Sequence, residues 1–199
     1  MLYYFPKRDA INDESPPYVI WDNCFTPRQL DMLQGMARKS SITGLTGKDL
    51  DISSTSNDDY RSSLIQWLER APETEWVYEK LAGVIQQVNF QYYNFDLLGL
   101  GESAQLSNYK SDANGGYNWH IDCISTGYVR KLSFSMQLCH PDEYEGGDLE
   151  VKISDEPIKI ERKRGLITIF PSWTLHRVTR VTSGERQSLV QWVSGPKFR

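Results

Sequence analysis

The chain has 199 residues, enough for one well-filled domain, and is 39% hydrophobic and 24% charged, as ordinary soluble globular proteins are. Its net charge of -4 gives no reason to expect a nucleic-acid or membrane partner. The apolar first eight residues are too short for a signal peptide or a membrane span. The three cysteines show no CxxC spacing, which favours a reducing compartment. We therefore expect one cytoplasmic domain over residues 1–199.

The N-terminal half, residues 1–100, predicts helical support for the rest of the chain. A short strand is expected over 18–21, and Thr26-Pro27-Arg28-Gln29 has the form of a capping box that begins a helix. Residues 62–68 predict a strand, and apolar residues at helical spacing predict a second helix over 74–89. The polar stretch 40–60 is long for a connecting loop, and we expect it to cover a site.

From about residue 95 onward, and so through the C-terminal half (residues 101–199), the sequence consists of short runs of β-forming residues. Turns rich in Gly, Pro and Asp, such as 112–116, separate these runs. The expected strands are 95–97, 104–109, 132–138, 149–153, 158–160, 166–170 and 188–193. Many short strands at such spacing favour a sandwich or barrel. The predicted fold is mainly β, with two helices supporting a double-sheet core.

The stretch Tyr117-Asn118-Trp119-His120-Ile121-Asp122 contains a candidate metal pair. Alternate side chains of a strand share a face, so His120 and Asp122 could converge on one ion. A His-x-Asp pair alone is a weak signal, because such pairs arise often by chance. With His176 from a later strand, the set becomes two His and one carboxylate, which suits non-haem Fe(II) with open positions.

A second candidate site follows His176. Arg186 and Ser188 begin a predicted strand in which they share one face with Val190 and Trp192. A guanidinium with a neighbouring hydroxyl is suited to hold a carboxylate, and this strand contains no acidic partner for the arginine. A carboxylate of a bound ligand is therefore the expected partner of Arg186.

Together these motifs resemble those of the Fe(II)/2-oxoglutarate-dependent dioxygenases, most closely the prolyl 4-hydroxylase-like branch. The likeness covers about half of the chain, from Ala104 to Val193. It includes two tyrosines before the first histidine, an acidic-Gly-Gly turn and a tryptophan after the arginine. The residues that carry it are Tyr109, Tyr117, His120, Asp122, Glu145-Gly146-Gly147-Asp148, Phe170-Pro171-Ser172, His176, Arg186, Ser188 and Trp192.

The resemblance implies a double-stranded β-helix (a cupin-like jelly roll) with Fe(II) on His120, Asp122 and His176. It implies 2-oxoglutarate as cosubstrate, with its distal carboxylate on Arg186, assisted by Ser188 and Tyr109. Gln137 stands where animal relatives carry a tyrosine that contacts 2-oxoglutarate, so this chain departs from the family there. O2 would be consumed, succinate released, and ascorbate would be stimulatory.

The same resemblance implies a prolyl residue of a peptide or protein as substrate, with Tyr117, Arg130 and Trp192 on the substrate side. Arg130 could instead lie in an exposed turn, and Trp192 could belong to the core. Hydroxylation of another residue or of a small molecule remains an alternative, as does a non-catalytic, metal-binding jelly-roll module. A Ser/His/Asp hydrolase is disfavoured because the chain has no Gly-x-Ser-x-Gly motif. We expect a monomer or weak dimer.

Overall fold

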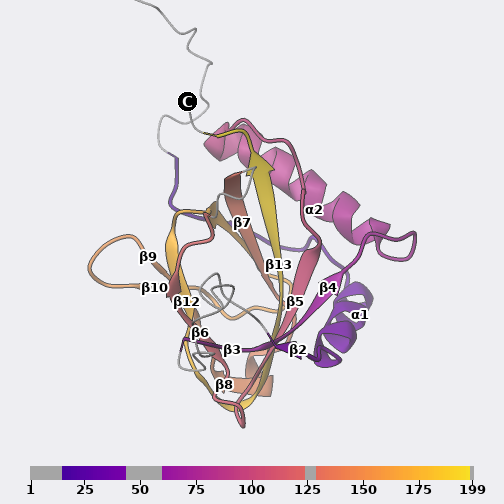
Figure 1. Ribbon diagram of the computed structural model, residues 1–199, viewed down its shortest axis with the longest axis vertical. Helices are drawn as coiled ribbons and strands as arrows, with labels where there is room; N and C mark the ends of the chain where they lie inside the picture. The colour runs from indigo at the N-terminus through magenta and orange to yellow at the C-terminus, as the bar shows by residue number, and fades with distance from the viewer. Residues whose placement is uncertain (1–14, 44–59, 124–128, 198–199) are drawn as a thin grey trace, which may run out of the picture.

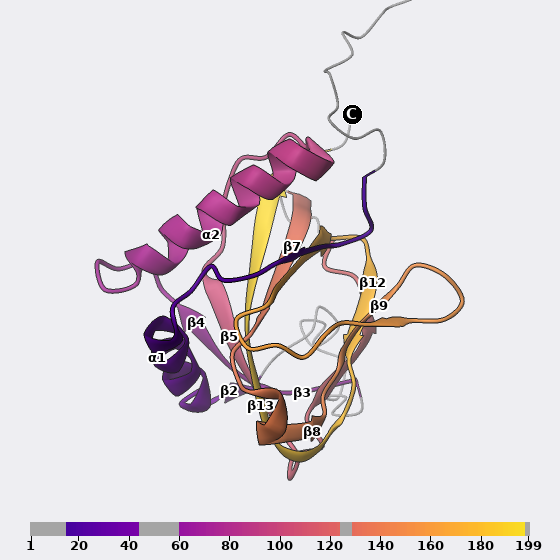
Figure 2. The ribbon, with the colours of Figure 1, turned by 180° about the vertical axis from the view of Figure 1, so that it is seen from behind.

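The computed structural model describes residues 15–43, 60–123 and 129–197. Most of the stretch that we expected to cover a site, residues 44–59, lies outside the described residues. The described chain forms two facing antiparallel sheets with two helices against the outer face of the larger one, as Figures 1 and 2 show. The predicted double-sheet β fold with two supporting helices is therefore confirmed.

The larger sheet holds strands from both halves of the chain, and all its neighbours pair antiparallel. Its spatial order is β1 (Val19–Trp21), β11 (Ile167–Pro171), β7 (Val129–Gln137), β13 (Val181–Gly195), β5 (Ala104–Lys110), β4 (Leu64–Leu68) and β2 (Ile42–Thr43), with β8 (Tyr144–Gly146) also paired to β13. The smaller sheet runs β10 (Ile158–Lys159), β9 (Leu149–Lys152), β12 (Leu175–Val178), β6 (Gly116–His120) and β3 (Arg61–Ser62).

The first helix, α1 (Pro27–Arg38), begins at the predicted capping box. The backbone N–H of Gln29 donates to Thr26 Oγ1 at 3.3 Å, and the backbone N–H of Thr26 donates to Gln29 Oε1 at 2.9 Å. The second helix, α2 (Glu75–Val88), matches the predicted range within one residue at each end. Among the described residues no helix is long and apolar enough to cross a membrane.

The strand expected at 95–97 is absent from the described chain, and that prediction was wrong. The helix α2 continues into a π-helical turn, η1 (Asn89–Tyr93), which ends at Asn94 with a φ of 51°. The Asn89 side chain then bonds both the N–H and the carbonyl of Phe95, at 2.9 Å each. These local bonds use the backbone groups that a strand neighbour would have paired.

The single strand expected over 62–68 is two strands in two different sheets. Arg61 pairs with Tyr117 of β6 in the smaller sheet, whereas Leu64 pairs with Asn108 of β5 in the larger sheet. The chain crosses between the sheets at Ser63. Hydrophobic pattern alone could not show this crossing, because β3 is only two polar residues long.

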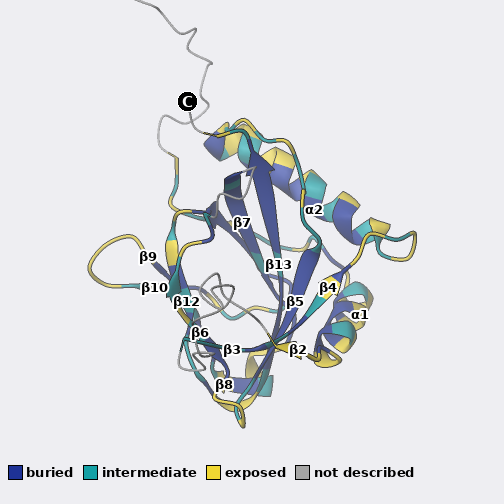
Figure 3. Ribbon diagram, viewed as in Figure 1, coloured by how far each residue is buried: buried dark blue, intermediate teal, exposed yellow. Residues whose placement is uncertain are grey.

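Side chains alternate along β13 between the helix-facing core and the space between the sheets. Leu189 and Val193 belong to the core beneath the helices, while Arg186, Ser188 and Trp192 face the other way. Figure 3 shows β13, β7 and β5 buried along most of their length, because helices cover one face and the smaller sheet covers the other. The predicted common face of Arg186, Ser188 and Trp192 is confirmed.

Candidate metal centre and cosubstrate pocket

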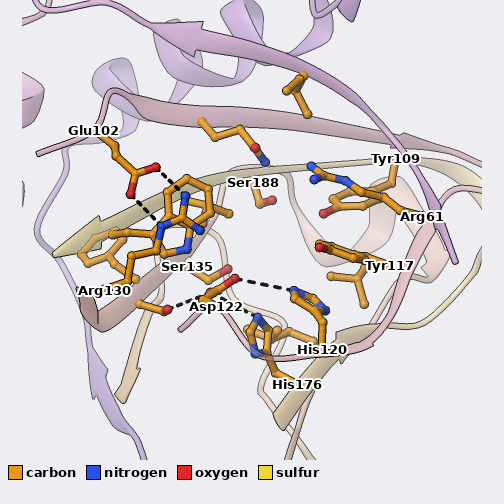
Figure 4. Close-up of a pocket in the computed structure, with 18 of the residues that line it drawn as sticks. Arg61, Glu102, Tyr109, Tyr117, His120, Asp122, Arg130, Ser135, His176 and Ser188 are labelled. Carbon is orange, nitrogen blue, oxygen red and sulfur yellow. Dashed lines mark hydrogen bonds and ion pairs between the residues drawn. The ribbon is translucent and has the colours of Figure 1, made fainter. Parts of the chain in front are cut away.

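A cavity of about 410 Å³ lies between the two sheets and brings together nearly all the residues that the sequence singled out (Figure 4). Strands β5, β7 and β13 provide one wall, and β6 and β12 provide the opposite wall. The predicted residues that line the cavity are Tyr109, Tyr117, His120, Asp122, Arg130, His176, Arg186, Ser188 and Trp192.

The two histidines and the aspartate form a compact group. His120 is the last residue of β6 and is paired directly with His176 of β12, and one ligand atom from each of His120, Asp122 and His176 lies within 4.8 Å of the others. Asp122 does not lie on the same strand as His120, contrary to the expectation. The strand ends at His120, and the N–H of Asp122 instead donates to Ser172 O at 2.8 Å.

Backbone carbonyls orient both imidazole rings. His120 Nδ1 lies 2.7 Å from the carbonyl of Asn118, and His176 Nδ1 lies 2.9 Å from that of Thr174. A carbonyl can only accept, so each Nδ1 carries the hydrogen and each Nε2 keeps a free lone pair. The Nε2 atoms lie 3.8 Å and 3.5 Å from the Asp122 carboxylate oxygens. This arrangement presents two imidazole Nε2 atoms and one carboxylate to a common point.

The protonation states also suit a metal. Burial and the nearby His176 lower the pKa of His120 to about 3, so its imidazole is neutral at pH 7. Burial disfavours the charged form of Asp122, but the two histidines and the hydroxyl of Ser133 outweigh that effect and lower its pKa. Neutral imidazole and ionised carboxylate are the forms that bind a divalent cation. The donor set therefore fits Fe(II) with positions left for other ligands.

The guanidinium of Arg186 is almost fully buried in the same cavity. It donates to Ser188 Oγ at 3.3 Å and lies 5.4 Å from the centre of the Tyr109 ring. Its Nε has no hydrogen-bond partner, and no carboxylate of the described residues pairs with it. A buried charge without a partner is costly, so the site is suited to receive the carboxylate of a ligand.

Gln137 lies outside the main cavity. Its side-chain amide donates to Cys139 Sγ at 2.9 Å and to the Tyr144 hydroxyl at 3.0 Å. It lines a much smaller neighbouring cavity, which Arg186 also borders. Gln137 therefore contacts Cys139 and Tyr144 and does not line the cavity that holds the two histidines.

Arg130 and Trp192 form one unit on the opposite side of the cavity. The guanidinium lies 3.9 Å from the centre of the Trp192 ring and makes two hydrogen bonds to the Glu102 carboxylate, one of them from Nε at 2.6 Å. Arg130 is therefore on β7 inside the cavity and not in an exposed turn. Glu102 was missed in the sequence because nothing near it forms a recognisable motif.

Tyr117 lies flat against the metal group. Its ring stacks on His120 with centres 3.5 Å apart, and burial raises the pKa of its hydroxyl. The hydroxyl is therefore protonated at neutral pH and points into the cavity in Figure 4. Ser133 was also missed, and Ser172 had been noted only as part of the Phe170-Pro171-Ser172 segment. Ser133 Oγ donates to Asp122 Oδ2 at 2.7 Å and lies 3.0 Å from Ser172 Oγ.

The model of the 2OG-Fe(II) oxygenase superfamily matches residues 104–194. This region of the chain is therefore similar to that superfamily. A PKHD-type hydroxylase of Synechococcus sp. (strain CC9311) is 44% identical over 85 residues, which are 42% of this chain and 39% of that protein. A PKHD-type hydroxylase of Hyphomonas neptunium is 39% identical over 88 residues, with the same shares covered. The chain spans about two fifths of the length of these curated relatives.

Solved structures share the fold of nearly the whole chain. A prolyl-4-hydroxylase of Pseudomonas putida is similar with a TM-score of 0.69 and 17% identity, over 91% of this chain and 94% of that one. A Trichoplax adhaerens prolyl hydroxylase, in complex with a hypoxia inducible factor peptide fragment, gives 0.71 and 17%, over 89% and 83%. The predicted double-stranded β-helix is therefore confirmed.

Proposed function

We propose that the protein is an Fe(II)- and 2-oxoglutarate-dependent dioxygenase that hydroxylates a prolyl residue in a peptide or protein. The observation that carries this proposal is the shared cavity: a carbonyl-oriented histidine pair with an ionised aspartate opens into the same space as a buried arginine without a carboxylate partner among the described residues. The histidine and aspartate group suits a metal, and Arg186 suits a carboxylate. A dicarboxylate that chelates the metal at one end needs both.

Each group of residues has a distinct task. When bound, Fe(II) with 2-oxoglutarate and O2 supplies the oxidation, a chemistry that protein side chains lack, and succinate and CO2 are released. His120 and His176 would hold the metal through Nε2, and Asp122 through a carboxylate oxygen. Arg186 and Ser188 would hold the far carboxylate of the cosubstrate, with Tyr109 beside the guanidinium. The two sheets exclude water from the space between these groups.

The substrate side is formed by Tyr117, Arg130 and Trp192. Glu102 and the Trp192 ring hold the Arg130 guanidinium in place before a substrate arrives. Because Glu102 already neutralises this charge, the remaining N–H groups suit a neutral carbonyl, such as that of a peptide, better than an acid. The PKHD-type relatives and the prolyl hydroxylase neighbours support a prolyl substrate.

Succinate formation tests the proposal. The purified protein is incubated with Fe(II), 2-oxoglutarate and ascorbate, with and without proline-containing peptides, and the peptides are examined by mass spectrometry for the gain of one oxygen atom. Turnover with an oxidised proline is expected. Oxidation at another residue or of a small molecule would favour the alternative substrate classes. Metal binding without any succinate would favour a non-catalytic module, and absence of both would overturn the metal site as well.

Three further features belong to the proposal. Ascorbate stimulates turnover, the protein acts in the cytoplasm as a monomer or weak dimer, and residues 1–199 act as a single domain. The odd number of cysteines supports a reducing compartment, and strands β2, β3 and β4 of the N-terminal half, which complete both sheets, support the single domain.

A further inference from the structure

Asp122 is the member of the metal group that no regular element positions. His120 and His176 lie on β6 and β12, but β6 ends two residues before Asp122. Past a strand end, the pleat no longer dictates where a side chain points. The carboxylate is nevertheless almost fully buried, so protein groups other than its own strand must hold it in place.

Two buried hydroxyl groups meet this need. Ser133 Oγ lies 2.7 Å from Asp122 Oδ2 and 3.0 Å from Ser172 Oγ. An ionised carboxylate can only accept, so the single hydroxyl hydrogen of Ser133 is directed to Asp122. Ser133 then accepts the hydrogen of Ser172. The hydrogen bonds therefore run in one direction, from Ser172 through Ser133 to Asp122, and each strengthens the next.

Ser172 lies in the turn between β11 and β12, and this turn also orients the second histidine. The carbonyl of Ser172 accepts the N–H of Asp122 at 2.8 Å, and the N–H of Ser172 donates to the carbonyl of Lys131 at 3.0 Å. Two residues later, the carbonyl of Thr174 accepts from His176 Nδ1 at 2.9 Å. The turn between β11 and β12 thus fixes the backbone of one metal residue, its carboxylate through Ser133, and the ring of another.

We propose that Ser133 and Ser172 are positioning residues for Asp122, acting as a two-hydroxyl relay that sets the orientation of its carboxylate and hence the affinity of the site for a divalent metal. Their role rests on the proposed function only in that the site must bind a metal. Ser133 fixes Oδ2, which keeps Oδ1 facing His120. Ser172 acts through Ser133, so its hydroxyl matters only while that of Ser133 is present.

Titration with Mn(II) in the absence of 2-oxoglutarate tests the relay. Electron paramagnetic resonance monitors the binding of the ion. Loss of a group that orients a metal ligand typically weakens binding, so Ser133→Ala should raise the Mn(II) Kd about tenfold or more. Ser172→Ala should raise it by about threefold, because the first hydroxyl remains. Ser133→Thr, which keeps the hydroxyl, should restore most of the affinity. The matched control is Ser40→Ala, since the buried hydroxyl of Ser40 has no partner among the described residues.

The double substitution separates a relay from two independent packing effects. If Ser172 acts through Ser133, then Ser133→Ala with Ser172→Ala should bind Mn(II) no more weakly than Ser133→Ala alone. Additive losses, or wild-type affinity in either single variant, would overturn the relay. If Ser133→Ala does not fold, wild-type affinity in Ser172→Ala still overturns it. Wild-type protein that binds Mn(II) but forms no succinate would overturn the proposed enzyme and leave the relay standing, whereas wild-type protein that does not bind Mn(II) would overturn both.

Discussion

His120 and His176 face each other across the ladder between β6 and β12, with ring centres 4.1 Å apart. Each ring is anchored by a carbonyl two residues earlier along the chain, that of Asn118 in β6 or that of Thr174 just before β12 begins. The strand pairing therefore brings the rings together, and the local backbone turns both Nε2 atoms inward. Neither histidine needs the other to be oriented.

Replacing His176 by alanine should abolish binding of Fe(II) or Mn(II) at micromolar metal and abolish succinate formation, because the site loses one of its three donors. The chain should remain folded, with an unfolding free energy within about 2 kcal/mol of wild type. Metal titration and chemical denaturation measure the two effects. His140→Ala is the matched control, since His140 is exposed and lies outside the cavity. Retained turnover in His176→Ala would refute the assignment.

Replacing Arg186 by glutamine should raise the 2-oxoglutarate requirement roughly 10- to 100-fold, as loss of a charge-assisted pair predicts. The Mn(II) Kd should change far less, because the arginine does not contact the three metal residues. The KM for 2-oxoglutarate and the metal Kd are measured side by side. Arg177→Gln, which breaks an ion pair with Glu150, serves as control. An equal loss in both quantities would mean that Arg186 supports the fold in general.

Replacing Arg130 by glutamine should raise the KM for the peptide substrate about tenfold while the KM for 2-oxoglutarate changes little. Glu102→Gln should give a smaller change in the same direction, because the guanidinium keeps its stacking on Trp192 but loses its partner. Steady-state kinetics with each substrate varied in turn provide the measurement. Arg38→Gln, which breaks the ion pair with Glu143 on the outer side of the larger sheet, is the control. If both KM values rose together, Arg130 would not be a substrate-side residue.

Asp148 should make stability depend on pH in the acid range. Burial disfavours its charged form, but hydrogen bonds from Arg162 and Lys159 outweigh this and lower its pKa below the ordinary 3.8. A lowered folded-state pKa contributes stability that is complete above the unfolded pKa and is lost as pH falls through the folded pKa. Asp148→Asn should therefore cost about 1–3 kcal/mol at pH 7 and progressively less below about pH 4.

Urea denaturation at a series of pH values checks this dependence. The exposed aspartate at position 31, paired with Arg164, provides the control: Asp31→Asn should change stability little at any pH, as exposed ion pairs do. A constant difference between Asp148→Asn and wild type from pH 7 to pH 3 would contradict the expected loss.

The parts of the site that could be predicted are those that depend on the period of a single strand. Arg186, Ser188 and Trp192 share a face because alternate residues must, and that face is buried because the strand lies in the middle of a sheet. The likeness of His120 and His176 to a known motif placed them together. The common face of β13 thus followed from spacing, whereas the pairing of the two histidines followed from the resemblance.

What could not be predicted depends on contacts between distant segments. The position of Asp122 depends on where β6 loses its neighbours, and its contact with Ser133 depends on the register of β7. Gln137 faces away from the main cavity because the Tyr144 hydroxyl lies within its reach, which no local pattern reveals. Similarly, the crossing at Ser63 follows from the partners of β3 and β4.

The position of β13 between two neighbouring strands affects which part of the cavity wall can open locally. From Ser188 to Val190 it pairs with β5 on one side and β7 on the other, so displacing the acid-binding end would break two ladders at once. Asp122, by contrast, is tethered by a few hydrogen bonds beyond a strand end. Amide hydrogens of β13 should exchange with solvent much more slowly than that of Asp122. The acid-binding end of the cavity is therefore expected to open to solvent less often than the segment that carries Asp122.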